Sequence, residues 1–370
     1  MKKSSTRTSL IAIGWSALAS LSVASLATAE LTVRTSPVFF NPSIGRSAKI
    51  HVAAPRPGEI TVEILDRDHF LVRSLATIAL ESEIEVSWDG KDDSGTVVPN
   101  EAYSIRIRFD GVDGRSEIYD PGSAKSTLPV SVTSFSYSRV DGVINYRLDA
   151  PSRVHIQAGQ LPQPPAIGAE GPILHTVVDR APRTGGAISE KWHGFDDSRT
   201  VYIPDLPGFV MAILASPLPA NALITTGSRG ENFAAYAARH RPAQVSIREQ
   251  VFGPELQHHQ GLTAIQDRSP RLSTARLTQG TGAIWTHRSG EKLQVLIGLE
   301  PTFEPVFVTP RARLHIFRDA TLITTLQCNE NPCSVDLPST SLSTGRHRLV
   351  ANWDSGLGPV GVGVRILEIQ

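Results

Sequence analysis

Residues 87–95 read SWDGKDDSG, and residues 191–199 read KWHGFDDSR. Each stretch places a glycine two residues after a tryptophan and then Asp-Asp-Ser, with Trp88 and Trp192 separated by 104 positions (192 − 88). A duplicated metal site would keep its first oxygen ligand, yet His193 stands where the first copy has an aspartate. The repeat therefore favours a structural role, a tryptophan-anchored turn whose aspartates accept backbone hydrogen bonds.

The fold signature of this repeat consists of the tryptophans and glycines of the two loops. Glycine permits the positive φ angles that tight turns require. In the second copy Arg199 replaces the last glycine of the motif. The signature residues are therefore Trp88, Gly90, Gly95, Trp192 and Gly194.

Runs of alternating apolar and polar residues surround both loops. In the first copy these runs are KIHVAA, EITVEIL and YSIRIRF, and in the second they are VINYRL, RVHIQA and FVMAILA. Alternation with period two places one face of a strand on a core and the other in water. Short strands separated by Pro, Gly, Asp and Asn are typical of sandwiches. We expect an all-β chain of tandem Ig-like or fibronectin-like β-sandwiches.

The first copy also resembles a known family. FNPS, APRPGEITVEILD and WDGKDDSGTVVPNEAYSIRI, in this order between about residues 38 and 110, are similar to the Ig-like domain of flagellar hook-capping (FlgD-type) proteins. Glu101 stands where that family usually has glycine. The matching positions are Trp88, Asp89, Gly90, Asp92, Gly95, Pro99 and Tyr103. The resemblance implies a small sandwich that recurs in exported bacterial proteins, and it implies no particular function.

Two later parts of the chain carry weaker resemblances. The second copy keeps Trp192, Gly194, Asp196 and Pro204 of the FlgD-type pattern. Residues 335–358, VDLPSTSLSTGRHRLVANWDSGLG, resemble the later strands of bacterial Ig-like repeats. These resemblances imply two further sandwiches.

The N-terminus has the three parts of a secretory signal peptide. Lys2, Lys3 and Arg7 precede an apolar run that ends near Leu26, and Ala-Thr-Ala then precedes Glu30. A transmembrane anchor is the alternative, but glycine and serines interrupt the run, and a bilayer core needs roughly 20 apolar residues. We expect cleavage before Glu30, export to the periplasm or cell exterior, and no membrane span in the mature chain.

These observations divide the chain into five parts. They are a signal peptide (1–29), a FlgD-type Ig-like domain (30–120), a second, diverged Ig-like domain (128–228), a linker (229–247) and a C-terminal Ig-like sandwich with an irregular first segment (248–370). In the linker, Phe233, Tyr236 and Ala237 have helical spacing, with an ordered linker as the alternative. Residues 248–290 show little periodicity.

The two cysteines, Cys328 and Cys333, lie in CNENPC. An exported chain meets an oxidising compartment, which favours a local disulfide. A reactive or metal-binding pair is the alternative, but the CxxC spacing is absent and two thiols do not make a zinc site.

A calcium site is the alternative reading of the first loop. An EF-hand beginning at its first aspartate would need an oxygen ligand, a glycine and an acid where Lys91, Ser94 and Asn100 stand. A calcium site of another type would use Asp89, Asp92 and Asp93.

Other acidic and histidine pairs have structural interpretations. Asp66 and Asp68 suit a hairpin tip, with a catalytic acid pair as the alternative. The adjacent pair His258 and His259 would point to opposite faces of a strand and could share a metal only on a loop.

Composition and motifs favour a protein that binds rather than catalyses. The 36 basic and 36 acidic residues balance over the full chain, and the mature chain is slightly acidic, so neither nucleic acid nor an anionic membrane is an expected partner. No nucleophile elbow, phosphate loop or zinc motif occurs, so we expect no enzyme and no cofactor. We expect an exported structural or interaction protein that binds another protein or a cell-surface or extracellular assembly. The apolar and mostly uncharged residues 359–370 are a candidate sheet edge, with a strand that completes the third sandwich as the alternative.

Two other functions remain as alternatives. A carbohydrate-binding or glycan-associated module would use exposed aromatic residues, for which Trp285 and Trp353 are the candidates. A hydrolase would use the segment 248–290, where the candidates are Glu255, His258, His259 and Asp267.

Overall fold

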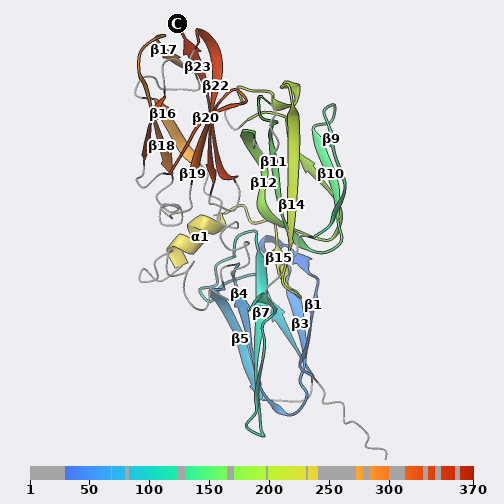
Figure 1. The fold of residues 1–370 in the computed structure, drawn as a ribbon. Helices are drawn as coiled ribbons and strands as arrows, with labels where there is room; N and C mark the ends of the chain where they lie inside the picture. Colours follow the sequence, from blue (N-terminus) through green and yellow to red (C-terminus); the bar gives the residue numbers. More distant parts are fainter. Residues whose placement is uncertain are drawn as a thin grey trace, which may run out of the picture.

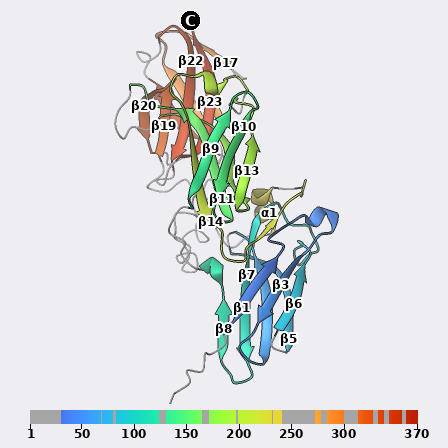
Figure 2. The same cartoon turned by 90° about the vertical axis from the view of Figure 1, so that its right-hand side faces the viewer.

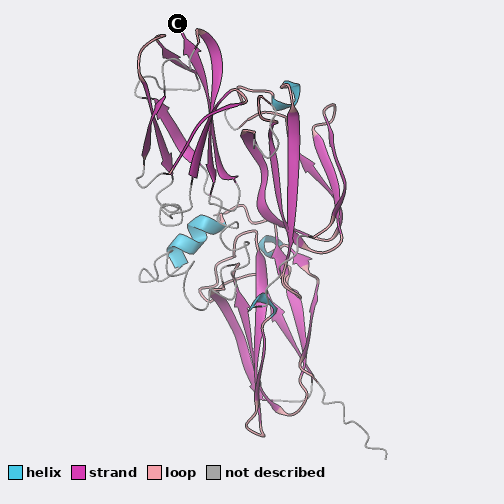
Figure 3. Cartoon of the chain, viewed as in Figure 1, coloured by secondary structure: helices cyan, strands magenta, loops and turns pink. Residues whose placement is uncertain are grey.

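The alternating runs form strands that pack as three β-sandwiches, which confirms the all-β fold class (Figures 1 and 3). The computed structural model describes residues 30–67, 69–79, 83–123, 130–164, 171–196, 199–230, 232–240, 272–277, 284–299, 313–327, 332–337, 343–354 and 359–370. The expected signal peptide, Asp68, Cys328 and the candidates Glu255, His258, His259 and Asp267 lie outside these residues.

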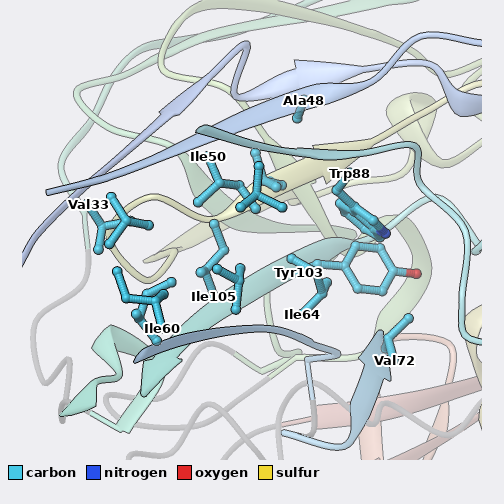
Figure 4. Close-up of a cluster of buried hydrophobic side chains, with 14 of the residues drawn as sticks. Val33, Ala48, Ile50, Ile60, Ile64, Val72, Trp88, Tyr103 and Ile105 are labelled. Carbon is cyan, nitrogen blue, oxygen red and sulfur yellow. The ribbon is translucent and has the colours of Figure 1, made fainter. Parts of the chain in front are cut away.

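The first sandwich, module 1, comprises residues 30–123 and one strand from farther along the chain. One sheet has the order β1 (Thr32–Ser36), β3 (Ala48–Ala53) and β6 (Glu83–Trp88). The facing sheet has the order β2 (Phe39–Phe40), β15 (Leu223–Thr225), β7 (Ala102–Gly111), β4 (Gly58–Leu65) and β5 (Leu71–Ala79), and β8 (Ser116–Tyr119) also pairs with β7. Every second residue of β3, β4 and β7 is buried between the sheets, where Ile50, Ile60, Ile64 and Ile105 meet Trp88 and Tyr103 (Figure 4).

The second sandwich, module 2, comprises residues 130–217 and repeats this strand order. One sheet is β13 (Gly186–Lys191), β10 (Val143–Leu148) and β9 (Val132–Ser138), seen from outside in Figure 2. The other is β12 (Ile173–Arg183), β11 (Ser152–Gln160) and β14 (Phe209–Pro217). In chain order, β9 to β14 correspond to β1 and β3 to β7, so the repeat read from the two loops extends to whole sandwiches.

Strand β15 corrects a predicted boundary. Residues 223–225 fall within the range 128–228 assigned to the second domain, yet β15 pairs with β7 and, in parallel, with β2 of module 1 (Figure 1). Leu223 is fully buried in the core of module 1. After module 2 the chain therefore returns to module 1 and adds a strand to it.

The third sandwich, module 3, comprises the described residues from 272 to 370. One sheet has the order β16 (Leu272–Leu277), β18 (Leu293–Leu299) and β21 (Cys333–Leu337). The other sheet has the order β17 (Ile284–His287), β23 (Pro359–Ile369), β22 (Gly345–Asp354), β19 (Arg313–Arg318) and β20 (Thr321–Leu326). Strand β23 lies between β17 and β22, so the C-terminal segment is an inner strand that completes module 3, and the candidate free edge is wrong.

In the described residues, helical structure is confined to short segments. Three 3-10 turns span Pro42–Ile44, Pro121–Ser123 and Ile203–Asp205, and the one α-helix of the described chain, α1, spans Phe233–His240 where helical spacing was expected. In the part of the chain that the structure describes, no helix has the length and apolar character to cross a membrane.

Candidate functional site

The tryptophan of the first loop is the centre of the module 1 core. Trp88 is fully buried, with ring centroids 5.6 Å from Phe40 and 5.2 Å from Tyr103 in edge-to-face geometry. Its indole Nε1 donates to the carbonyl oxygen of Lys91 at 2.9 Å. The side chain thus ties the start of the loop to both sheets.

Asp92 builds the turn that follows. Its Oδ1 accepts hydrogen bonds from the backbone N–H groups of Ser94 (3.0 Å) and Thr96 (2.9 Å) and from the Ser94 hydroxyl (2.6 Å). Its Oδ2 accepts from the Tyr236 hydroxyl at 3.0 Å. Both carboxylate oxygens are used by the protein itself.

The other two aspartates of the loop serve different neighbours. Asp89 Oδ1 accepts from the Lys91 N–H at 3.1 Å, and Asp93 Oδ1 accepts from the Ser74 N–H at 3.3 Å. Across the described ranges no group of three or more His, Cys, Asp or Glu residues is placed to hold a metal ion. The three carboxylates considered for calcium therefore each support a separate piece of backbone.

The second loop repeats these hydrogen bonds. Trp192 Nε1 donates to the Phe195 carbonyl at 3.1 Å, and Asp196 Oδ1 accepts from the Thr200 N–H at 2.8 Å. His193 Nδ1 accepts from the Phe195 N–H at 3.0 Å, as Asp89 does from Lys91 in the first loop. Histidine can replace the aspartate because the position needs only one acceptor.

The shared glycine of the two loops leaves no room for a side chain. Gly90 has φ of +72° and Gly194 has φ of +84°, in the left-handed region. A Cβ atom would lie 2.4 Å from Pro42 in the first loop and 2.3 Å from the Tyr202 ring in the second. Sterics and backbone conformation both select glycine here.

The last glycine of the motif has only a conformational role. Gly95 has φ of +82°, and a Cβ atom there would meet nothing within 4 Å. Arg199 takes the same place in module 2 with φ of +56°. A non-glycine residue is tolerated there because the surroundings are open, at the cost of left-handed backbone strain.

Asp92 is expected to contribute more than Asp89 to the stability of module 1. Burial alone would raise the pKa of the Asp92 carboxyl, but hydrogen bonds from Ser94, Thr96 and Tyr236 together hold that pKa below its ordinary value. Asp92→Ala leaves the buried Tyr236 hydroxyl without this acceptor, so we expect a loss of about 2–3 kcal/mol in the free energy of unfolding. Asp89→Ala, at a half-exposed side chain, should cost about 0.5 kcal/mol or less.

Urea denaturation with and without calcium checks this prediction. The ionised Asp92 contributes stability above the unfolded-state pKa of an aspartate, and this contribution is lost as the pH falls through its lower folded-state pKa. The difference between wild type and Asp92→Ala should therefore shrink in acid. A calcium-induced rise in the wild-type urea midpoint that vanishes in Asp92→Ala would restore the metal hypothesis.

A buried ion-pair cluster joins modules 1 and 2. Glu101 is 3% exposed, and its Oε1 accepts from Arg153 Nη1 of module 2 at 2.5 Å and from the Ala102 N–H at 2.7 Å. Its Oε2 accepts from Arg67 Nη1 at 3.1 Å. The departure of Glu101 from the FlgD-type pattern thus has a structural reason, because its carboxylate links two modules.

Strand β15 and its flanks add uncharged contacts to the same junction. Thr225 Oγ1 donates to the Pro99 carbonyl at 2.7 Å. The side chain of Asn100 exchanges two hydrogen bonds with the backbone of Ser228, at 2.8 and 3.0 Å. Asn221 Nδ2 donates to the Val33 carbonyl at 3.0 Å. The segment after module 2 is therefore fixed to module 1 along its length.

Helix α1 packs on the same end of module 1. Tyr236 bonds to Asp92, and the Arg67 guanidinium lies over the Phe233 ring, 4.2 Å from its centroid. The His240 ring stacks on Tyr236 with centroids 4.3 Å apart. The loop at residues 88–96 therefore contacts helix α1 through Asp92.

Modules 2 and 3 meet through polar and apolar contacts. The Asn352 side chain accepts from the Ile173 N–H and donates to the Ile173 carbonyl, both at 2.8 Å, and so caps an edge of β12. Arg348 Nη2 donates to Gln160 Oε1 at 2.6 Å. The apolar residues of module 3 that join the module 2 core cluster are Phe317, Val350, Val362, Val364 and Ile366.

The buried histidine His155 of β11 is uncharged. Burial, together with the nearby positive charge of Arg180, lowers the pKa of His155 to about 3. Its imidazole is therefore neutral at physiological pH.

The other candidate site residues that the structure describes have structural roles. Trp285 and Trp353 are each 2% exposed in the module 3 core, so neither offers an aromatic platform to a sugar. Asp66 Oδ1 accepts from the Phe70 N–H at 3.0 Å, as expected of a hairpin tip. Cys333 is buried and is not a free thiol, while its predicted partner Cys328 lies outside the described residues, so the pairing stays a prediction.

The solved structures that this chain resembles and that are named below have low sequence identity to it. No family model and no curated protein matches the sequence. The fibronectin(III)-like modules of Clostridium thermocellum CbhA match with 9% identity over 92% of this chain and 94% of theirs, with a TM-score of 0.20. A 1.5-MDa bacterial ice-binding adhesin matches with 10% identity over 92% and 98%, also with a TM-score of 0.20.

A third structure, Escherichia coli alpha-2-macroglobulin, matches with 11% identity over 92% of this chain and 31% of its own, with a TM-score of 0.18. Similarities at this level carry no argument about function. The fold assignment rests on the sheets of the chain itself, and the FlgD-type assignment of module 1 stays a prediction.

Proposed function

We propose that this chain is an exported, non-catalytic structural protein, built of a FlgD-type and two further Ig-like modules, that binds another protein or a cell-surface or extracellular assembly. The signal-peptide pattern supports export. The resemblance of module 1 to the FlgD-type domain supports an accessory, non-enzymatic module.

The observation that carries the proposal is the construction of the junctions. Modules within one chain usually move relative to each other unless their interface is large and apolar. Here a buried carboxylate, an added strand and a side chain capping a strand edge join the modules through Glu101, β15 and Asn352. Such junctions hold surfaces on different modules at fixed separations, which suits a structural or adapter protein.

The carbohydrate alternative lacks such support. All four tryptophans that the structure describes are buried. A glycan-binding sheet face normally presents exposed aromatic rings.

A binding assay on isolated cell envelopes of the source organism tests the proposal. The labelled chain from Glu30 to Gln370, the form that signal cleavage would leave, should bind envelopes saturably. Protease treatment of the envelopes should abolish binding, whereas glycosidase treatment should not. Absence of saturable binding would overturn the proposal, and binding that survives protease but is lost after glycosidase treatment would favour the carbohydrate alternative.

A further inference from the structure

Strands β7 and β14 occupy equivalent places in modules 1 and 2 but differ at one edge. Strand β7 pairs with β4 on one side and with β8 and β15 on the other. Strand β14 pairs with β11 on one side over nine consecutive residues without a bulge. Among the residues that the structure describes, no strand pairs with its other edge, because the next strand of the chain, β15, joins module 1 instead.

Side-chain burial reflects this difference. The core-facing residues of β7 are all fully buried, namely Tyr103, Ile105, Ile107 and Phe109. At the equivalent positions of β14, Phe209, Met211 and Ile213 are only partly buried. Module 2 therefore leaves apolar surface uncovered where β8 and β15 complete module 1.

The outward face of β14 is also apolar. Val210 is 40% and Leu214 is 39% exposed, and Ala212 between them is exposed. The same face of β7 carries Arg106 and Arg108. Edge strands of soluble proteins usually carry charge, proline or a bulge that prevents pairing, and residues 209–216 have none of these.

The backbone groups that face outward can be identified. The Phe209 N–H donates to the Leu206 carbonyl, and the Ala215 carbonyl accepts from the Val130 N–H. In an antiparallel ladder, every second residue directs both backbone groups to the same side. Met211 and Ile213 therefore direct their N–H and C=O groups away from β11, and no described residue bonds to them there.

We propose that a second copy of the chain supplies this strand, so that β14 pairs with β14 of the other copy, antiparallel about a two-fold axis at Ala212. Met211 of each copy then lies opposite Ile213 of the other copy. The axis thus relates two Met211–Ile213 pairs, and each pair forms two backbone hydrogen bonds. Val210 packs against Leu214 of the second copy on the exposed face. The small alanine lies on the axis, where the two chains approach most closely.

Self-pairing is favoured because the free edge is its own complement. A two-fold interface brings the same patch of both copies together. The free groups of Met211 and Ile213 lie symmetrically around Ala212, and the strand has no charge to repel its copy. The equivalent edge of module 1 shows that this fold has room for added strands beside β7. This dimer is independent of the partner proposed above.

Sedimentation velocity on the chain from Glu30 to Gln370 tests the dimer. We expect a monomer–dimer equilibrium between about 1 and 100 µM, and Leu214→Lys should weaken association at least about tenfold because it places a charge within the strand pair. The control Val140→Lys adds the same charge in module 2 at a residue that is 95% exposed in the turn between β9 and β10, and it should dimerise like wild type.

A cysteine at the two-fold axis tests the register without relying on destabilisation. Ala212→Cys should form an intermolecular disulfide under mild oxidation, because directly opposed residues in a non-hydrogen-bonded pair have Cα atoms about 4.5 Å apart. Val140→Cys should not. A chain that stays monomeric, or a dimer unaffected by Leu214→Lys and not crosslinked at position 212, would overturn the proposal. Envelope binding by Leu214→Lys, tested separately, distinguishes this failure from failure of the proposed function.

Discussion

Replacing Trp88 by alanine is expected to remove about 3–5 kcal/mol from the free energy of unfolding of module 1. The side chain is fully buried against Phe40 and Tyr103, so the substitution leaves a cavity between the two sheets. It also removes the hydrogen bond from Nε1 to the Lys91 carbonyl, which holds the loop. Urea denaturation followed by far-UV circular dichroism measures the change.

Two further variants serve as comparisons for Trp88→Ala. Trp88→Phe should cost less, because an aromatic ring still fills part of the site while the indole N–H is lost. Trp192→Ala should destabilise module 2 in the same way, since Trp192 is 4% exposed and bonds to its own loop. A Trp88→Ala variant that loses less than about 1 kcal/mol would show that the loop is not anchored as described.

The second large effect is expected at Glu101. Glu101→Gln keeps the shape of the side chain but leaves Arg153 and Arg67 facing an uncharged amide in a buried site. Breaking a buried ion pair by removing one partner typically costs about 3–5 kcal/mol, because a buried charge loses its compensation. The midpoint of urea denaturation should therefore move to a lower urea concentration.

Glu85→Gln is the matched control. Glu85 pairs with Lys49 at 2.7 Å, but both side chains are about half exposed. Solvent and salt screen such a pair, so its loss should leave the urea midpoint unchanged within error. If Glu101→Gln behaves like this control, the Glu101 cluster does not hold modules 1 and 2 together.

Local patterns predicted the sandwiches and their turns well. Period-two alternation in β3, β4 and β7 identifies a strand and its buried face without knowledge of its neighbours. The repeated loop predicted equivalent turns because Asp92 and Asp196 accept bonds from residues only a few positions away. A local interaction leaves its signature in a local stretch of sequence.

Pairing between distant segments was not predictable in this way. Leu223, Ile224 and Thr225 suit a strand, but their sequence does not indicate which sheet receives it, so the boundary at 228 was wrong. The alternation of side chains in residues 359–369 predicts a strand, but it does not reveal that β17 pairs with this strand and covers its edge. Glu101 was visible as a departure from the family pattern, but its partner Arg153 lies 52 positions away. Only the tertiary structure brings such groups together.

The fusion of modules 1 and 2 through β15 is tested most directly by hydrogen–deuterium exchange on the chain from Glu30 to Gln370. The N–H groups of Ile224, Thr225 and Thr226 donate to carbonyls of Val38, Glu101 and Phe40, at 2.7, 2.9 and 3.0 Å. These amides should be protected as strongly as those in the middle of β7, because they open only when module 1 unfolds. Exchange of residues 224–226 at the rate of an exposed linker, with β7 still protected, would contradict the fusion.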